Sequence, residues 1–236
     1  MKLSSQFCHS SFLALLSLGF ADAAKATTVI VDGGFETPSL AASGETWAMS
    51  TTAAAGWSTT ASDHQIEIWT NGFYGVDAFE GNQFTEINAN QKAALYQDVS
   101  GLAAGLEVDF SFAHRGRVTN ESMQFTITDL GADGLYGTAD DTTLFSKIYT
   151  DGTDAWGIYS SAAEAAVLTT GDTLRFSFTS LTEGSYGNFL DGVNVSTSGV
   201  VATPEPSTWA GVGALFLLTF GSATYRRAQA LLARAR

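Results

Sequence analysis

The sequence predicts an all-β protein, an antiparallel jelly-roll β-sandwich. Short runs rich in Val, Ile, Phe, Thr and Tyr alternate with polar residues, and clusters of Gly, Asp, Asn and Ser separate these runs. No long segment of the body keeps the period of a helix. A period of two gives each strand one dry and one wet face, which is typical of antiparallel sheets packed on a common core.

The strongest strand signals lie at 106–113, 123–128 and 174–179, where large apolar side chains occupy every second position. Further strands are expected at 28–31, 65–69, 83–88, 93–99, 143–149 and 189–196. Residues 161–167 are expected to form a short helical turn. About nine strands in one body indicate a jelly roll. We place this sandwich domain at 27–196 and a short polar linker at 197–203.

Residues 1–26 have the three parts of a secretory signal peptide. Lys2 lies near the start, an apolar run spans 12–20, and small residues precede Thr27. Cleavage after Ala23 and cleavage after Ala26 both satisfy the small-x-small rule. A spanning helix needs roughly 20 apolar residues, so an uncleaved anchor is the weaker alternative. The only cysteine, Cys8, lies in this segment, so the mature body would form no internal disulfide.

The charges are divided unevenly along the chain. From Thr27 to Thr203 there are 22 Asp and Glu residues but only five Lys and Arg residues, a net charge of −17. Such a body repels phosphate backbones, so a nucleic-acid partner is not expected. An acidic surface instead suits solubility outside the cell and attracts divalent cations.

The C-terminal tail has the features of a single membrane-spanning helix. The stretch 209–225 is apolar and is bracketed by Trp209 and Tyr225, and Arg226 and Arg227 follow directly. Aromatic residues favour the two membrane interfaces, and arginines stay on the cytoplasmic side. We therefore expect the body to lie on the outer side of the inner membrane.

A short proline motif comes just before this apolar stretch. Pro204, Glu205 and Pro206 would form a stiff, extended segment that a membrane enzyme could recognise. Together, residues 204–236 resemble the PEP-CTERM sorting signal, which in that family is cut by an exosortase-type membrane transpeptidase. The alternative is a plain tail anchor with a chance Pro-Glu-Pro. The resemblance implies a Gram-negative bacterium that makes extracellular polysaccharide.

Several short motifs in the body resemble galactose-binding-domain-like carbohydrate-binding modules. They are 31–38 (VDGGFETP), 56–57 (GW), 84–90 (FTEINAN), 95–99 (LYQDV), 112–117 (FAHRGR) and 189–195 (FLDGVNV). The resemblance implies a module that binds glycans without cutting them, often with one structural calcium ion. In such modules the positions of Glu36 and Asp191 tie the first strand to the last through that ion. The alternative is two ordinary carboxylates, one in a solvated turn and one at a strand end.

A second candidate calcium site is the acidic segment 129–141. Asp129, Asp133 and Asp140 match positions of a calcium-binding EF-hand loop, and Gly134 matches its glycine. Position 3 of that loop is Gly131, however, and no helices flank the segment. An ordinary acidic hairpin loop is the alternative.

Ligand contacts are expected where positive charge and aromatic rings lie together. The candidates are His114, Arg115, Arg117, Trp57, Trp69 and Tyr74. Arginine can bind sugar hydroxyls or carboxylates with two parallel hydrogen bonds, and aromatic faces can stack on sugar rings. The alternative is that the arginines pair with internal carboxylates and the rings fill the core.

The leading hypothesis is a non-catalytic binding protein of the cell surface or extracellular matrix. Its partners would be an extracellular polysaccharide, the inner membrane through the tail, and the exosortase-type enzyme. The second hypothesis is a calcium-dependent structural or adhesion protein of the matrix. An enzyme that processes glycosides is third, because the sequence lacks the common nucleophile and zinc motifs.

Overall fold

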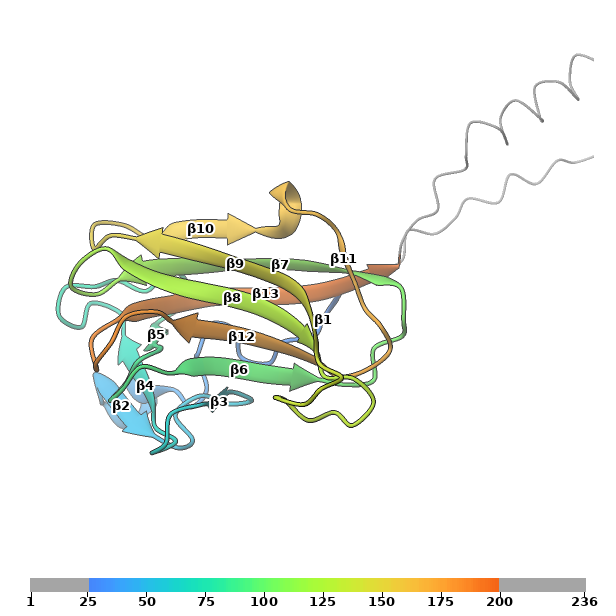
Figure 1. Ribbon diagram of the computed structural model, residues 1–236. Coiled ribbons are helices and arrows are strands. Elements are labelled where there is room, and N and C mark those ends of the chain that lie inside the picture. Colours follow the sequence, from blue (N-terminus) through green and yellow to red (C-terminus); the bar gives the residue numbers. More distant parts are fainter. Residues whose placement is uncertain (1–25, 200–236) are drawn as a thin grey trace, which may run out of the picture.

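The computed structural model describes residues 26–199, which form a sandwich of two antiparallel sheets (Figure 1). Sheet A contains β1 (Thr27–Thr28), β2 (Trp47–Ser50), β4 (Ile66–Thr70), β5 (Gln83–Glu86), β7 (Leu106–Gly116), β10 (Gly157–Ser160), β11 (Val167–Leu168) and β13 (Asn188–Gly199). Sheet B contains β3 (Ser58–Thr59), β6 (Ala94–Val99), β8 (Glu121–Asp129), β9 (Thr142–Asp151) and β12 (Leu174–Ser180). The described body is thus nearly all β, which confirms the predicted fold class.

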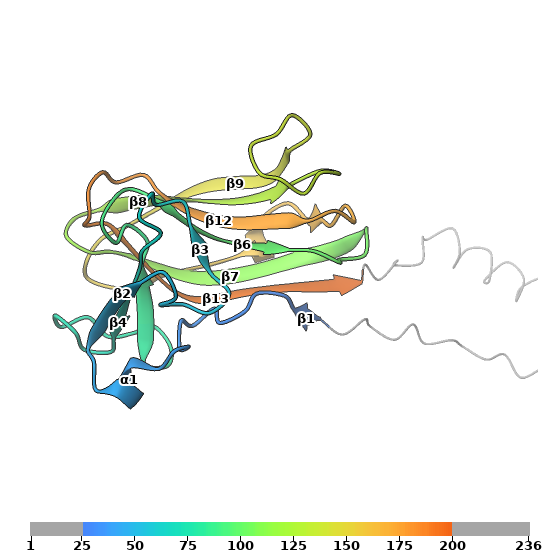
Figure 2. The same ribbon diagram turned by 90° about the horizontal axis from the view of Figure 1, so that it is seen from below.

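The strand order explains how one chain builds both layers. In sheet A the order is β10-β7-β13-β5-β4-β2, with β1 on β13 and β11 on β7; in sheet B it is β3-β6-β12-β8-β9. Successive strands from β5 to β8 cross between the sheets, as in a jelly roll. Figure 2 shows the two layers from another side, with the short helix α1 (Leu40–Ser43) beyond the end of sheet A.

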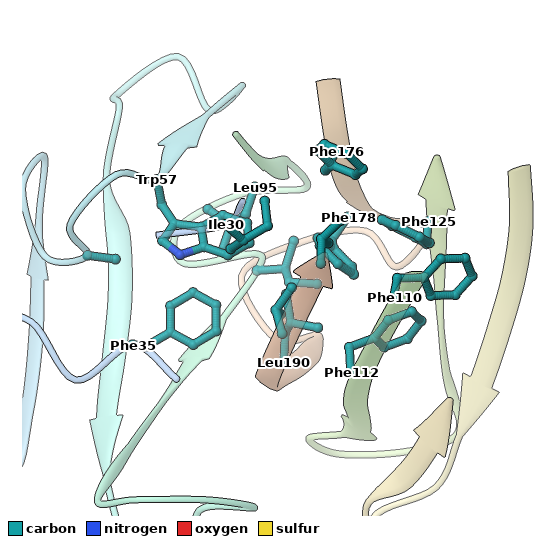
Figure 3. Close-up of a cluster of buried hydrophobic side chains, with 14 of the residues drawn as sticks. Ile30, Phe35, Trp57, Leu95, Phe110, Phe112, Phe125, Phe176, Phe178 and Leu190 are labelled. Carbon is teal, nitrogen blue, oxygen red and sulfur yellow. The ribbon is translucent and has the colours of Figure 1, made fainter. Parts of the chain in front are cut away.

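The core lies between the sheets and is rich in phenylalanine (Figure 3). Phe112 on β7 packs edge-on against Phe178 on β12, with ring centroids 5.2 Å apart. Phe125 on β8 stacks on the same Phe178 at 4.6 Å. These side chains are fully buried, as the period-two alternation predicted.

The first and last segments of the domain approach each other very closely. A Cβ atom on Gly33 would lie 1.7 Å from the carbonyl oxygen of Val193, so only glycine fits there. The register between β13 and β7 shifts between Asp191 and Asn194, and Gly192 in this bulge has a φ of 58°. The bulge brings Asp191 and the opening segment together.

Four short strands were not predicted: β2, β3, β10 and β11. They have two to four residues each, too few for a recognisable alternation. In the segment 161–167 only Ser161–Ala163 form a helical turn, of the 3₁₀ type, and Val167 already belongs to β11. Strand β13 continues to Gly199, so the first three residues of the expected linker pair with β7.

The two ends of the described body lie side by side, because Thr27 pairs with Thr197 and Thr28 with Ser196. The signal peptide, the motif at 204–206 and the expected helix at 209–225 lie outside residues 26–199. Within that range no helix is long and apolar enough to span a bilayer.

Candidate binding site

The candidate site lies on the face of sheet A that points away from sheet B. On β4, Ile66 and Ile68 face the core, so Glu67 and Trp69 face outward. Trp69 is nevertheless buried, because it belongs to a second apolar cluster with Phe84 and Phe189. Loops cover this outer face of the sheet. The alternation of apolar and polar residues along the strands predicted that this face would be exposed to solvent.

An open hollow of about 310 Å³ lies over this face. Three aromatic side chains on its rim are exposed: Trp47 by 48%, Tyr74 by 82% and Tyr186 by 58%. Asn90 and Ser185 add polar groups that can form hydrogen bonds. The hollow combines apolar walls with a few polar groups, as ligand sites generally do.

Arg117 follows β7, and its guanidinium lies over two rings of this site. Its guanidinium carbon lies 4.6 Å from the centre of the Trp69 ring and 4.3 Å from that of Tyr186. One of its nitrogens donates a hydrogen bond to the carboxylate of Glu86. Arg117 thus positions the exposed ring of Tyr186 over the hollow.

Two acidic side chains face each other beneath the hollow. Glu67 and Glu86 are direct partners across β4 and β5, and both are buried. Glu67 lines the hollow and accepts a hydrogen bond from Nε1 of Trp69 at 2.8 Å. Burial, together with the charge of Glu67, raises the pKa of Glu86 to about 8, although Arg117 acts in the opposite direction.

The loop that carries Ser185 and Tyr186 is fixed by hydrogen bonds from below. The side-chain nitrogen of Asn88 donates to the carbonyl oxygens of Thr182 and Gly184, both at 3.0 Å. The backbone N–H of Gly187 donates to Glu86 at 2.9 Å. The position of Tyr186 is therefore set by buried groups.

Tyr74 occupies a tight turn with an unusual backbone conformation. Its φ is 50°, in the left-handed region that a bulky residue rarely adopts. Its ring lies 5.7 Å from Trp69 and 4.6 Å from Phe73. Backbone strain of this kind concentrates at functional sites, and here it presents an aromatic ring to solvent.

Three of the six candidate ligand residues meet at this site: Arg117, Trp69 and Tyr74. The sequence did not point to Trp47, Glu67, Asn90, Ser185 or Tyr186. The available signal was an aromatic residue inside a turn rich in Gly and Ser, as at Tyr186. An aromatic residue in such a turn lies away from the core, so its exposure to solvent could have been predicted.

His114 is a core residue and does not reach the hollow. It is fully buried, and its Nδ1 lies 2.6 Å from Asp151 while its Nε2 lies 2.7 Å from Asn188. Tyr159 donates a hydrogen bond to the same Asp151 at 2.9 Å. Both ring nitrogens are used in this network, and the side chain does not line the hollow.

Arg115 and Trp57 also lie away from the hollow. The side chains of Arg115 and His114 point to opposite sides of β7. Arg115 donates a hydrogen bond to the carbonyl oxygen of Thr153. Trp57 is part of the main core, 5.0 Å from the ring of Phe35, and its Nε1 donates to the carbonyl oxygen of Asp32. Neither side chain lines the hollow, so the structure does not bring them together with the other candidates.

Glu36 and Asp191 do tie the two ends of the domain to a common element, the loop 79–83. Asp191 accepts hydrogen bonds from the backbone N–H groups of Phe79, at 2.8 Å, and Glu80, at 3.1 Å. Glu36 accepts those of Asn82 and Gln83, at 2.6 and 2.9 Å. Burial raises the pKa of Asp191 to about 7. These hydrogen bonds join both carboxylates to the same loop.

The acidic segment 129–141 is a hairpin loop whose carboxylates bind its own backbone. Each carboxylate accepts a hydrogen bond from a backbone N–H group of the loop. The pairs are Asp129 with Gly131, Asp133 with Leu135, and Asp140 with Ala132. These contacts correspond to the hairpin alternative. Residues 26–199 contain no group of three or more Asp, Glu, His or Cys side chains that could hold a metal ion.

No protein-family model matches this sequence, and no curated protein matches it. Solved structures with a related shape share little sequence with it. The carbohydrate-binding module TmCBM61, in complex with β-1,4-galactotriose, has 14% identity and a TM-score of 0.45, over 72% of this chain and 97% of the module. The CBM22-1 xylan-binding domain from Paenibacillus barcinonensis has 11% identity and a TM-score of 0.46, over 77% and 100%.

The K2 cleaved adhesin domain of Lys-gingipain has 16% identity and a TM-score of 0.44, over 73% of this chain and 97% of that one. All three TM-scores are below 0.5, so these structures carry no information about a ligand of this chain. Fold and site together define a β-sandwich with an aromatic hollow on the outer face of one sheet.

The raised pKa of Glu86 predicts that stability depends on pH. The folded protein holds this proton up to about pH 8, whereas the unfolded chain releases it near the ordinary value of 4.5. The free energy of unfolding should therefore fall as pH rises from about 4.5 to 8. Urea unfolding at several pH values should show a shallower fall in Glu86→Gln. Glu183→Gln, which removes a charge from an exposed position, should keep the wild-type slope; equal slopes in all three proteins would contradict the assignment.

Proposed function

We propose that this chain is an exported, non-catalytic glycan-binding protein of the cell surface or extracellular matrix. The observation that carries the proposal is the group of exposed rings, Trp47, Tyr74 and Tyr186, around one hollow. Faces of aromatic rings stack on the C–H faces of sugars, and nearby amide and hydroxyl groups bind sugar hydroxyls. A soluble domain gains no stability by exposing three large rings together, so a binding role accounts for them best.

The place of the hollow on the body supports this role. Strand β13 begins at Asn188, next to the loop of Tyr186, and ends at Gly199, beside Thr27. Its 12 residues span roughly 36 Å, so the hollow and the chain ends lie at opposite ends of the sandwich. In Figure 1, β13 runs along the length of the body. A body attached through its C-terminal end would present the hollow away from the attachment.

The buried carboxylates support a binding role without catalysis. Glycosidases of the common type place two carboxyl groups on either side of the scissile bond. Here only Glu67 lines the hollow, while Glu86 is fully buried beneath it and bonded to Arg117. A sugar in the hollow could touch one of the two at most.

Replacing Tyr186 by Ala should weaken binding to a glycan identified on an array by about tenfold, since one stacking surface is lost. Tyr136→Ala is a matched control, because Tyr136 is also about 60% exposed and also covers an arginine, Arg175, at 4.4 Å. Isothermal titration of both variants and the wild type measures the effect. Equal affinities would show that the hollow is not the binding site, and an array without any bound glycan would refute the proposal.

The exported state and the sorting of the chain rest on its two ends. We propose that the signal peptide at 1–26 directs the chain through the inner membrane of a Gram-negative bacterium. The helix at 209–225 and the arginines at 226 and 227 would hold it there until an exosortase-type enzyme acts at 204–206. The released body would then act on extracellular polysaccharide.

Replacing Pro204 and Pro206 by Ala should leave the chain in the inner membrane, because the recognised segment loses its stiffness. Cell fractionation and immunoblotting of a tagged body compare this variant with the wild type. A wild-type chain found in the cytosol at full length would contradict both export and sorting, and an unchanged distribution would favour a plain tail anchor.

Calcium binding near loop 79–83 is a further part of the proposal. Asp191 is buried, and in the described part of the chain it forms no ion pair with a basic side chain. A cation held by Asp191 and Glu36 would stabilise the ionised form of Asp191. Calcium should then raise the midpoint of thermal unfolding, and Asp191→Asn should abolish the increase. Identical midpoints with calcium and with chelator would remove calcium from the proposal.

A further inference from the structure

A second hollow adjoins the first on the outer face of sheet A. Its volume is about 200 Å³, and its walls include Val76, Val118 and Phe189. Trp69, Tyr74 and Arg117 line both hollows. The two spaces therefore form one continuous surface that passes over these three shared side chains.

The two hollows differ in chemistry. Glu67, Asn90 and Ser185 line only the first, whereas the side chains that line only the second are hydrocarbon. Val118 is 58% exposed, so a ligand in the second hollow can contact its methyl groups. The second hollow thus offers apolar contact beside a polar neighbour.

The charge of Arg117 does not make the second hollow a binding site for anions. Its guanidinium donates a hydrogen bond to Glu86 and lies over the rings of Trp69 and Tyr186. A carboxylate or sulfate would have to replace these contacts, and the net charge of −17 on the body would repel it. A hydroxyl group placed against Val76 and Val118 would lose its bonds to water without gaining a partner.

We propose that the ligand lies across both hollows, with a hydroxylated sugar ring in the first and a methyl-bearing substituent in the second. The substituent is an acetyl group or the methyl group of a 6-deoxy sugar. This inference rests on the proposed glycan-binding function and narrows the class of glycan. Tyr74 and Arg117 form the ridge between the two parts of the ligand.

Pairs of glycans that differ only in the methyl-bearing group test the inference. One pair is L-fucose and L-galactose glycosides, which differ in a methyl and a hydroxymethyl group. The other is an O-acetylated oligosaccharide before and after removal of its acetyl groups by mild alkali. The methyl-bearing member of at least one pair should bind about fourfold more tightly, which corresponds to one buried methyl group. The pair that shows the preference identifies the source of the methyl group.

Val118→Asp should make the affinities for the two glycans of that pair nearly equal, because it places a carboxylate in the apolar hollow. Leu135→Asp is the matched control; Leu135 is 62% exposed in the acidic loop and lines neither hollow, so the preference should persist. Tyr186→Ala should lower both affinities by a similar factor and keep their ratio.

Glycan binding with no preference for the methyl-bearing member would overturn this inference and leave the proposed function standing. A preference that survives Val118→Asp would also overturn it, since the methyl group would then lie elsewhere. If the wild type binds neither member of any pair and no glycan on an array, the proposed function fails and the inference fails with it.

Discussion

The outer face of sheet A depends on the contact between Arg117 and Glu86. Glu86 is fully buried, and a buried carboxyl group without a hydrogen-bond partner would cost about 1–3 kcal/mol. Arg117 donates a hydrogen bond to it, and the guanidinium carbon of Arg117 lies over the rings of Trp69 and Tyr186. Glu86 also holds the backbone of Gly187. This contact therefore joins the end of β7, strands β4 and β5, and the loop that carries the exposed ring.

The shortage of basic residues explains how the remaining carboxylates are used. With 22 acidic and five basic residues between 27 and 203, most Asp and Glu residues cannot form an ion pair. Asp191, Glu36 and Asp140 instead accept backbone N–H groups and thereby order loops. A body without cysteine is in this way stabilised by its core and by carboxylate-to-backbone bonds, while its surface stays negative.

The aromatic residues fall into two groups with different roles. Phenylalanines such as Phe112, Phe125 and Phe178 fill the space between the sheets and set the distance between the layers (Figure 3). A second group, Trp47, Trp69, Tyr74 and Tyr186, has rings that carry a polar group and lines the hollow. The core fixes the sheet, and the sheet fixes the hollow, so a glycan would meet a surface that is already formed.

The sequence by itself determined the two-layer, all-β body, because the alternation in 106–112, 123–127 and 174–178 leaves only one dry face on each strand. It also placed Trp69, Tyr74 and Arg117 among six candidate ligand residues, since aromatic rings can stack on sugars and positive charge is scarce in this acidic body. Only the tertiary structure decided that His114 is buried between Asp151 and Asn188 and that Trp57 belongs to the core. The period-two pattern states which side chains share a face but not whether a distant loop covers that face. The loop at 181–187 comes about 100 residues after Glu86, and this long-range contact adds a wall over the outer side of a strand and so forms the hollow.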